Sequence, residues 1–145
     1  MVVMGIDPGA SGGVAWIRDG GSTAVPMPDT ERDLLDFLSD GIEEETRFAY
    51  LEKVHSMPRQ GVASTFKFGV NYGMLRGMLI ALRIPFDDVT PQKWQKEMGC
   101  LTRGDKNVSK ARAQQLFPQL KVTHAIADAL LIAEFGRRLK AGEIK

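Results

Sequence analysis

The first 27 residues alternate short apolar runs with glycine-rich turns, and this pattern constrains the fold more than any other feature of the chain. The first run, residues 2–7, ends on Asp7 and opens into a Pro-Gly turn that holds three glycines within six residues. A second run, 13–18, ends at Asp19-Gly20-Gly21, which is a strong hairpin signal, and a third covers 22–27. The pattern predicts a meander of three consecutive strands.

Helices and further strands are predicted along the rest of the chain. Apolar runs of strand length occupy 48–54 and 85–89, and a long helical pattern covers 61–82. Four other helices are expected where a capping residue precedes a helical pattern, and these caps are Thr30, Thr90 followed by Pro91, Ser109 and Thr123. We expect the first of these to close at Gly41, the third to end before Pro118, and the last to reach about Leu139.

The element order βββαβαβα, with helices toward the end, sets the expected fold class. Hairpins followed by alternating strand and helix imply a mixed five-stranded sheet with helices on both faces, which is the α/β order of the ribonuclease H fold. At 145 residues, the chain is expected to form a single domain over 1–145.

The helix expected over 61–82 carries two parallel stripes. Apolar side chains recur every four residues, at Phe66, Val70, Met74, Met78 and Leu82. Glycines recur beside them at Gly69, Gly73 and Gly77, and each costs about 1 kcal/mol inside a helix relative to alanine. Two interpretations are open: close packing against the protein's own sheet, or a helix at a dimer interface.

Composition restricts the chemistry. Cys100 is the only cysteine and His55 and His124 are the only histidines, so an intramolecular disulfide is impossible and a Cys/His zinc site lacks ligands. Metals that prefer oxygen ligands, such as Mg²⁺, stay open. The sequence shows no apolar stretch of membrane-spanning length and no signal-type leader, so we expect a cytoplasmic protein with no membrane association.

Charge is divided unevenly along the chain. Residues 1–52 hold three Lys and Arg against eleven Asp and Glu, whereas residues 53–121 hold twelve Lys and Arg against four Asp and Glu. A basic central segment suits a protein that binds a polyanion across one face, although a solvated surface of mixed charge would have the same composition.

Asp7 is an unusual residue to find at the end of an apolar strand. Three roles are open for its carboxylate: accepting hydrogen bonds from the turn, flanking a phosphate cradle built from the amides of the glycine turn, or binding a cation. A cation is a common way to offset the cost of burying a carboxylate.

Other potential ligands are expected near Asp7. Glu52 lies toward the end of the fourth strand, which neighbours the first in this fold, and the alanine-rich last helix can approach closely enough to bring in Asp128. His124 precedes Asp128 by one helical turn and projects from the same face. Four ligands for a hard metal are therefore predicted to converge.

Four short motifs together contain three of the candidate ligands, and these motifs are Gly5-Ile6-Asp7-Pro8-Gly9, Ser11-Gly12-Gly13, Leu51-Glu52 and Ala127-Asp128-Ala129-Leu130. In these motifs the chain resembles the RuvC family of Holliday-junction resolvases, within the ribonuclease H-like nucleases, and especially its small phage-type members. The resemblance implies a homodimer whose two active sites cut opposed strands of a four-way DNA junction by phosphodiester hydrolysis.

The resemblance also implies the cofactors and the site residues. Each site would use two ions of Mg²⁺ or Mn²⁺, with Asp7 bridging them, Glu52 holding one, and Asp128 and His124 holding the other. Many family members have an acid in place of His124. The residues implied or considered for DNA contact are His55, Gln60, Lys67, Lys93, Lys106 and Lys110, of which Lys106 is the first choice.

Rival functions are separated by other features. Actin-like and sugar-kinase-like ATPases have similar Asp-x-Gly loops but bind nucleotide between two such domains, so a chain of 145 residues is not expected to bind a nucleotide cofactor. A non-enzymatic junction binder would not need the full set of Asp7, Glu52, His124 and Asp128. A related nuclease that cuts flaps, Y-forks or RNA-containing hybrids stays open as the alternative.

Overall fold

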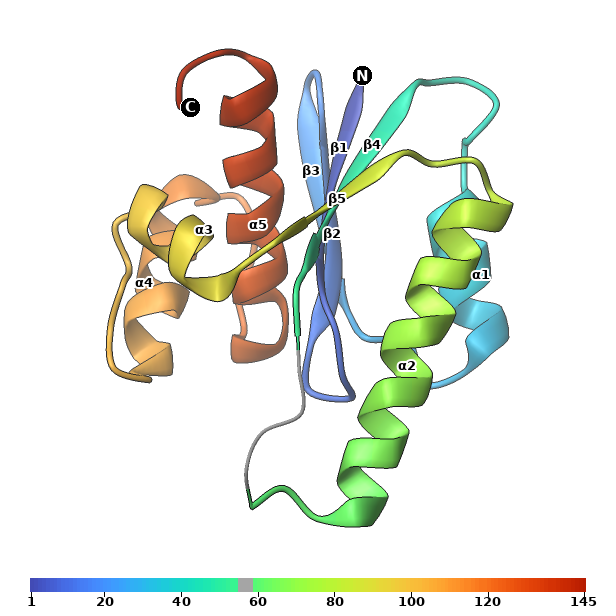
Figure 1. Cartoon of the computed structure of the whole chain (residues 1–145). Helices are drawn as coiled ribbons and strands as arrows, with labels where there is room; N and C mark the ends of the chain where they lie inside the picture. The colour runs from blue at the N-terminus through green and yellow to red at the C-terminus, as the bar shows by residue number, and fades with distance from the viewer. Residues whose placement is uncertain (55–58) are drawn as a thin grey trace.

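Five strands form one mixed sheet in the order β3-β2-β1-β4-β5 (Figure 1). The computed structural model describes residues 1–54 and 59–145. The strands are β1 (Val2–Asp7), β2 (Gly13–Arg18), β3 (Gly21–Pro26), β4 (Arg47–Glu52) and β5 (Phe86–Val89). The first three pair antiparallel, while β4 pairs parallel with both β1 and β5. The predicted meander and mixed five-stranded sheet are confirmed.

Helices cover both faces of this sheet, as predicted. The helices are α1 (Glu31–Ser39), α2 (Val62–Ala81), α3 (Pro91–Glu97), α4 (Lys106–Leu116) and α5 (His124–Lys140). Figure 1 shows α1 and α2 on one side of the sheet and α3, α4 and α5 on the other. Each side of the sheet has its own apolar core. Among the described residues, no helix is long and apolar enough to cross a membrane.

The helices start at the predicted positions, with one exception, although the side chain of Thr123 at the start of α5 makes no capping hydrogen bond within the described residues. The Thr30 hydroxyl accepts a hydrogen bond from the Asp33 amide at 3.0 Å, and Thr90 caps α3 in the same way. The prediction that Ser109 caps the next helix was wrong. That helix begins one turn earlier, at Lys106, because the Asp105 carboxylate accepts from the Asn107 amide at 3.0 Å, and Ser109 is buried inside α4.

Helix α5 lies directly against β1, and one glycine makes this possible. A Cβ atom on Gly5 would overlap the carbonyl oxygen of Ala129 and the backbone of Ala133. Small residues on both sides of the contact therefore allow the helix backbone to approach the strand backbone. This approach carries the side chains of α5 to the end of β1, as the alanine-rich sequence predicted.

Helix α2 turns its glycine stripe outward. Apart from the backbone of the helix itself, no described atom lies within 4 Å of a Cβ added at Gly69, Gly73 or Gly77. The interpretation that this stripe packs closely against the protein's own sheet is therefore wrong. The apolar stripe also diverges from the core: Phe66 is 72% exposed and Val70 46%, whereas the buried residues of α2 are Leu75 and Leu79. A repeat of four residues drifts by about 40° per step around a helix of 3.6 residues per turn, so it cannot follow one buried face.

Candidate active site

Asp7 and Glu52 occupy equivalent positions on neighbouring parallel strands. Each is the last residue of its strand, and Ile6 pairs with Leu51 one residue earlier. Strand side chains alternate between faces, and Val3 on β1 and Tyr50 on β4 belong to the core beneath α5. Asp7 and Glu52 therefore emerge at the same edge of the sheet and on the face that α5 covers.

The turn after Asp7 folds back on itself immediately. Gly9 has a φ of +100°, and its carbonyl accepts a hydrogen bond from the Gly12 amide at 3.0 Å. A Cβ on Gly12 would overlap the carbonyl oxygen of Asp7, and a Cβ on Gly13 would lie 2.6 Å from the Ala125 carbonyl oxygen. The glycines that the sequence placed around Asp7 thus keep the turn compact and let the first residues of α5 approach it.

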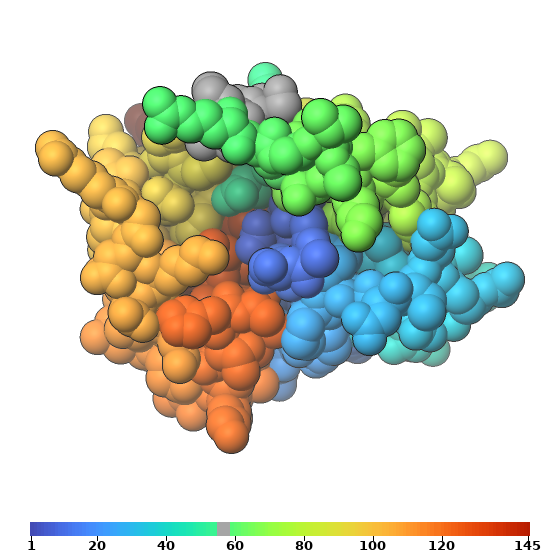
Figure 2. Space-filling view, turned by 90° about the horizontal axis from the view of Figure 1, so that it is seen from below, coloured from blue at the N-terminus to red at the C-terminus, as the bar shows by residue number. Residues whose placement is uncertain are grey.

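The first turn of α5 completes a cleft beside Asp7. The cleft has a volume of about 260 Å³ and is lined by Asp7, Ser11, Lys106, His124, Ala125, Ala127 and Asp128. Figure 2 views this end of the molecule, with the blue turn after β1 at the centre, the gold and orange of α4 and α5 on one side, and the green start of α2 on another. Glu52 is not among the lining residues.

Burial and neighbouring negative charges raise the proton affinity of the two strand acids. Burial raises the pKa of Asp7 to about 8, with the charges of Glu52 and Asp128 adding to the rise and Lys106 opposing it. Burial likewise raises the pKa of Glu52 to about 7; the hydrogen bond from Trp94 opposes the rise and the charge of Asp128 adds to it. Both acids therefore lie in a site that disfavours their negative charge.

Asp128 belongs to the same electrostatic environment. Burial raises the pKa of its carboxyl group, while Lys106, a hydrogen bond with Ser109, and His124 act in the opposite direction. The charge of Asp128 therefore acts on both strand acids, and the convergence of the three carboxyl groups on one metal stays a prediction. His124 is exposed one turn before Asp128 and lines the same cleft as Asp7 and Asp128.

The residues present fit a hard divalent cation in chemistry. Carboxylate oxygens are the ligands that Mg²⁺ and Mn²⁺ prefer, and a cation would offset the burial and the neighbouring negative charge that raise the pKa values of Asp7 and Glu52. Among the residues that the structure describes, no three His, Cys, Asp or Glu side chains are already arranged as a metal-binding group. The donors are thus suitable in chemistry, and Asp7, Glu52, His124 and Asp128 are the residues that would hold the metal.

The raised pKa values predict that the metal-free protein loses stability as the pH rises. The folded state binds protons more tightly than the unfolded state, since the pKa of Asp7 moves from 3.8 to about 8 and that of Glu52 from 4.5 to about 7. The resulting stabilisation is complete below about pH 4 and is lost by about pH 8. Urea unfolding in EDTA at pH 5, 7 and 9 should give a falling free energy of unfolding. A constant or rising value over this range would contradict the assignment.

Two residues that support the site were not identified from the sequence. The indole N–H of Trp94 donates a 2.7 Å hydrogen bond to Glu52, and Trp94 itself is completely buried in α3. Ser109, which was assigned a capping role, instead acts on Asp128 from inside α4. The sequence offered only one signal for the first of these: a tryptophan on a short, well-capped helix directly after a strand.

The residues predicted to contact DNA lie in different parts of the structure. Lys106 reaches the cleft, and Lys110 follows it by one turn on α4. Gln60 and Lys67 line a second cavity of about 490 Å³ that extends from the turn after β1 to α2. Lys93 lies 6.0 Å from the ring centroid of Phe135, about three helical turns along α5 from His124, and is not brought to the cleft. His55 lies outside the described residues.

Comparison with solved structures decides the fold. Thermus thermophilus RuvC superposes with a TM-score of 0.61 at 15% identity, covering 98% of this chain and 97% of the other. The fold is that of RuvC. The structure of T. thermophilus RuvC in complex with a Holliday junction substrate agrees, with a TM-score of 0.63, 17% identity, and coverage of 98% and 96%. No protein-family model matches the sequence, and no curated protein matches it. The likeness to RuvC confirms the predicted ribonuclease H-like architecture.

Proposed function

We propose that this protein is a metal-dependent endonuclease that resolves four-way DNA junctions by phosphodiester hydrolysis. The observation that carries the proposal is the cleft in which Asp7 from β1 lies beside His124 and Asp128 from α5, in a fold like that of RuvC. Burial of Asp7 and Glu52, which raises the pKa of both, agrees with it. One of the structurally similar RuvC proteins was solved with a Holliday junction substrate. The basic segment 53–121 agrees with a polyanionic substrate.

The chain's own residues divide the work of hydrolysis. Asp7, Glu52, His124 and Asp128 would hold Mg²⁺ or Mn²⁺, two ions in each site, and the bound ions would activate water and stabilise the leaving oxygen. Lys106, exposed at the cleft, would attract the scissile phosphate and stabilise the charge that develops on it. His124 would either bind metal or orient the attacking water.

Trp94 should matter through Glu52. Trp94→Phe removes the N–H that holds the Glu52 carboxylate, so we expect the cleavage rate at limiting Mg²⁺ to fall about tenfold and the Mg²⁺ requirement to rise. Trp16→Phe is a matched control, because Trp16 belongs to the core on the other face and its indole N–H has no partner among the described residues. Titration of cleavage with Mg²⁺ tests both variants. Equal effects of the two substitutions would contradict the role of Trp94.

We propose that the active form is a homodimer that uses the outer face of α2. Cutting opposed strands of a junction needs two sites, and α2 presents Phe66 and Val70 beside glycines that leave room for a second backbone. Phe66→Glu should therefore shift the protein from dimer to monomer in light scattering. Leu101→Glu is the control, because Leu101 is 56% exposed but lies between α3 and α4. A dimer unaffected by Phe66→Glu would place the interface elsewhere.

Cleavage assays separate junction resolution from the alternative nuclease functions. Labelled four-way junction, Y-fork, flap, RNA–DNA hybrid and linear duplex substrates are incubated with the protein and Mg²⁺, beside Asp7→Asn. Symmetric nicks in the junction alone are the expected result. Equal cutting of all substrates would favour a general branched-DNA or hybrid nuclease, and junction binding without cleavage would indicate a binding protein.

A further inference from the structure

Helix α2 holds the turn that follows Asp7 through one side chain. The side-chain oxygen of Asn71 accepts a 2.8 Å hydrogen bond from the backbone amide of Gly9, which lies 62 positions away in the sequence. The ring of Phe68 covers the same glycine, because a Cβ added to Gly9 would lie 2.8 Å from it. Two side chains of α2 thus contact one peptide of the active-site turn.

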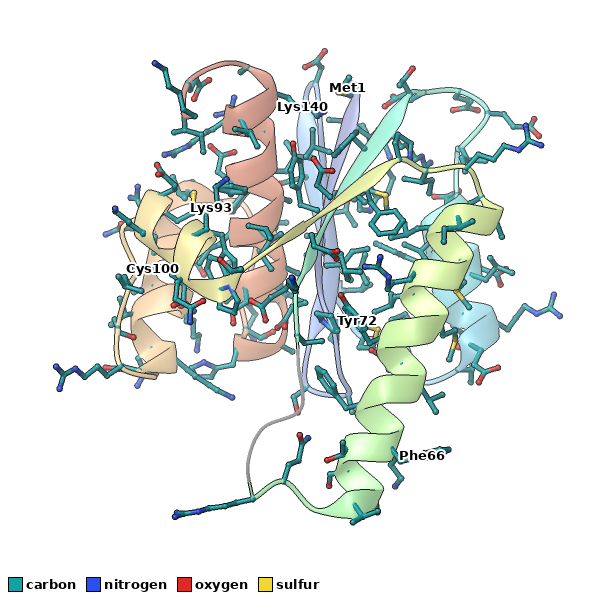
Figure 3. All side chains as sticks on the ribbon, viewed as in Figure 1. Met1, Phe66, Tyr72, Lys93, Cys100 and Lys140 are labelled. Atoms are coloured by element: carbon teal, nitrogen blue, oxygen red, sulfur yellow. The ribbon has the colours of Figure 1, made fainter. Side chains whose placement is uncertain are left out.

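This contact is prominent because the first half of α2 has little else to hold it. None of residues 62–74, all of which the structure describes, is buried, and the first buried residue of the helix is Leu75. Figure 3 shows Tyr72 directed toward the sheet and Phe66 directed away from it. The Tyr72 hydroxyl bonds Asp88 on β5 at 3.2 Å, so Phe68 and Asn71 lie on the inward side of the helix, beyond that anchor.

The chemistry of the turn explains why the Gly9 amide matters. Pro8 has no N–H, so Gly9 supplies the first backbone donor after Asp7. The Gly9 carbonyl is already used by the Gly12 amide within the turn. Asn71 therefore holds the Gly9 amide, which is the backbone donor two residues after Asp7.

We propose that Asn71 is a positioning residue, which sets the orientation of Asp7 by holding the Gly9 amide and thereby couples α2 to the active site. The inference rests on the proposed nuclease function. The outer face of α2 is exposed, so a partner that binds there acts on the turn through the same side chain. Displacement of a reacting group by about 1 Å is enough to lower a rate about 100-fold.

Two substitutions at one position separate the tether from simple packing. Asn71→Leu keeps the size of the side chain but removes the acceptor, whereas Asn71→Asp keeps an acceptor oxygen. We expect Asn71→Leu to lower the single-turnover rate of four-way junction cleavage by about 100-fold while leaving junction affinity in EDTA within about twofold. Asn71→Asp should recover most of the rate.

Amide hydrogen exchange gives a readout that does not depend on activity. The Gly9 amide should lose protection in Asn71→Leu and keep it in Asn71→Asp, in metal-free protein. If Asn71→Leu lacks a cooperative thermal transition, Asn71→Ala takes its place. Unchanged cleavage together with unchanged Gly9 exchange in Asn71→Leu would overturn the inference. An equal loss of cleavage rate and of Gly9 protection in Asn71→Leu and Asn71→Asp would also overturn it. A wild-type protein that cuts no substrate would overturn the proposed function, while the exchange result would still test the tether.

Discussion

Asp7→Asn is expected to lower junction cleavage at least about 1000-fold and, at pH 8, to raise the free energy of unfolding of the metal-free protein by about 2 kcal/mol. The activity falls because a neutral amide is a poor ligand for a divalent cation. The stability rises because burial and the charges of Glu52 and Asp128 disfavour the Asp7 carboxylate, whose pKa is raised to about 8. One substitution should therefore move activity and stability in opposite directions.

Both effects are measurable on the same preparation. Cleavage of labelled junction with Mg²⁺ gives the rate, and urea unfolding in EDTA gives the free energy. Asp36→Asn is the control, because Asp36 is exposed on α1 and should leave both quantities unchanged. Activity that survives in Asp7→Asn would refute the metal mechanism, and a loss of stability at pH 8 would refute the electrostatic description of the site.

Gly5→Val should destabilise the fold by about 3 kcal/mol or more. The added side chain would occupy the space of the Ala129 carbonyl and the Ala133 backbone, and backbone atoms cannot move aside by a rotamer change. Helix α5 would have to leave β1, which would also carry Asp128 and His124 away from Asp7. We expect a lower urea midpoint and, in whatever protein stays folded, loss of cleavage.

Gly21→Val provides the matched control for this prediction. Gly21 is also a strand glycine, at the start of β3, but no described atom lies within 4 Å of its added Cβ, and its φ is not positive. Valine there should be neutral or slightly stabilising, because it favours extended backbone. If both variants unfold at the same urea concentration, the close approach of α5 is not what limits stability.

Local sequence patterns were enough to predict the strands and to place three of the candidate site residues on their elements. Asp7 and Glu52 end apolar runs whose order fixes their pairing, and alanines around Asp128 indicate a helix that can approach the sheet. These signals are contained in short segments of chain, so no long-range contact is needed to interpret them.

The features that sequence did not predict depend on contacts between distant segments. The Trp94 hydrogen bond joins residues 42 positions apart, and the Asn71 bond to Gly9 joins residues 62 apart. The start of α4 was misplaced because two capping residues, Asp105 and Ser109, lie one turn apart and only the folded helix shows which is used. The sequence also left open which face of α2 packs against the sheet, because apolar residues lie on both sides of this helix.

The proposed cleavage activity depends on the register in which β1 pairs with β4. Asp7 and Glu52 lie at the same edge and on the same face of the sheet only because Ile6 is opposite Leu51, and a slip of one residue would send one of the two acids to the opposite face. We expect such a slipped form to keep its strands but to lose the proposed cleavage activity. Recovery of cleavage after refolding would therefore measure the fraction of molecules that regain the correct β1–β4 alignment.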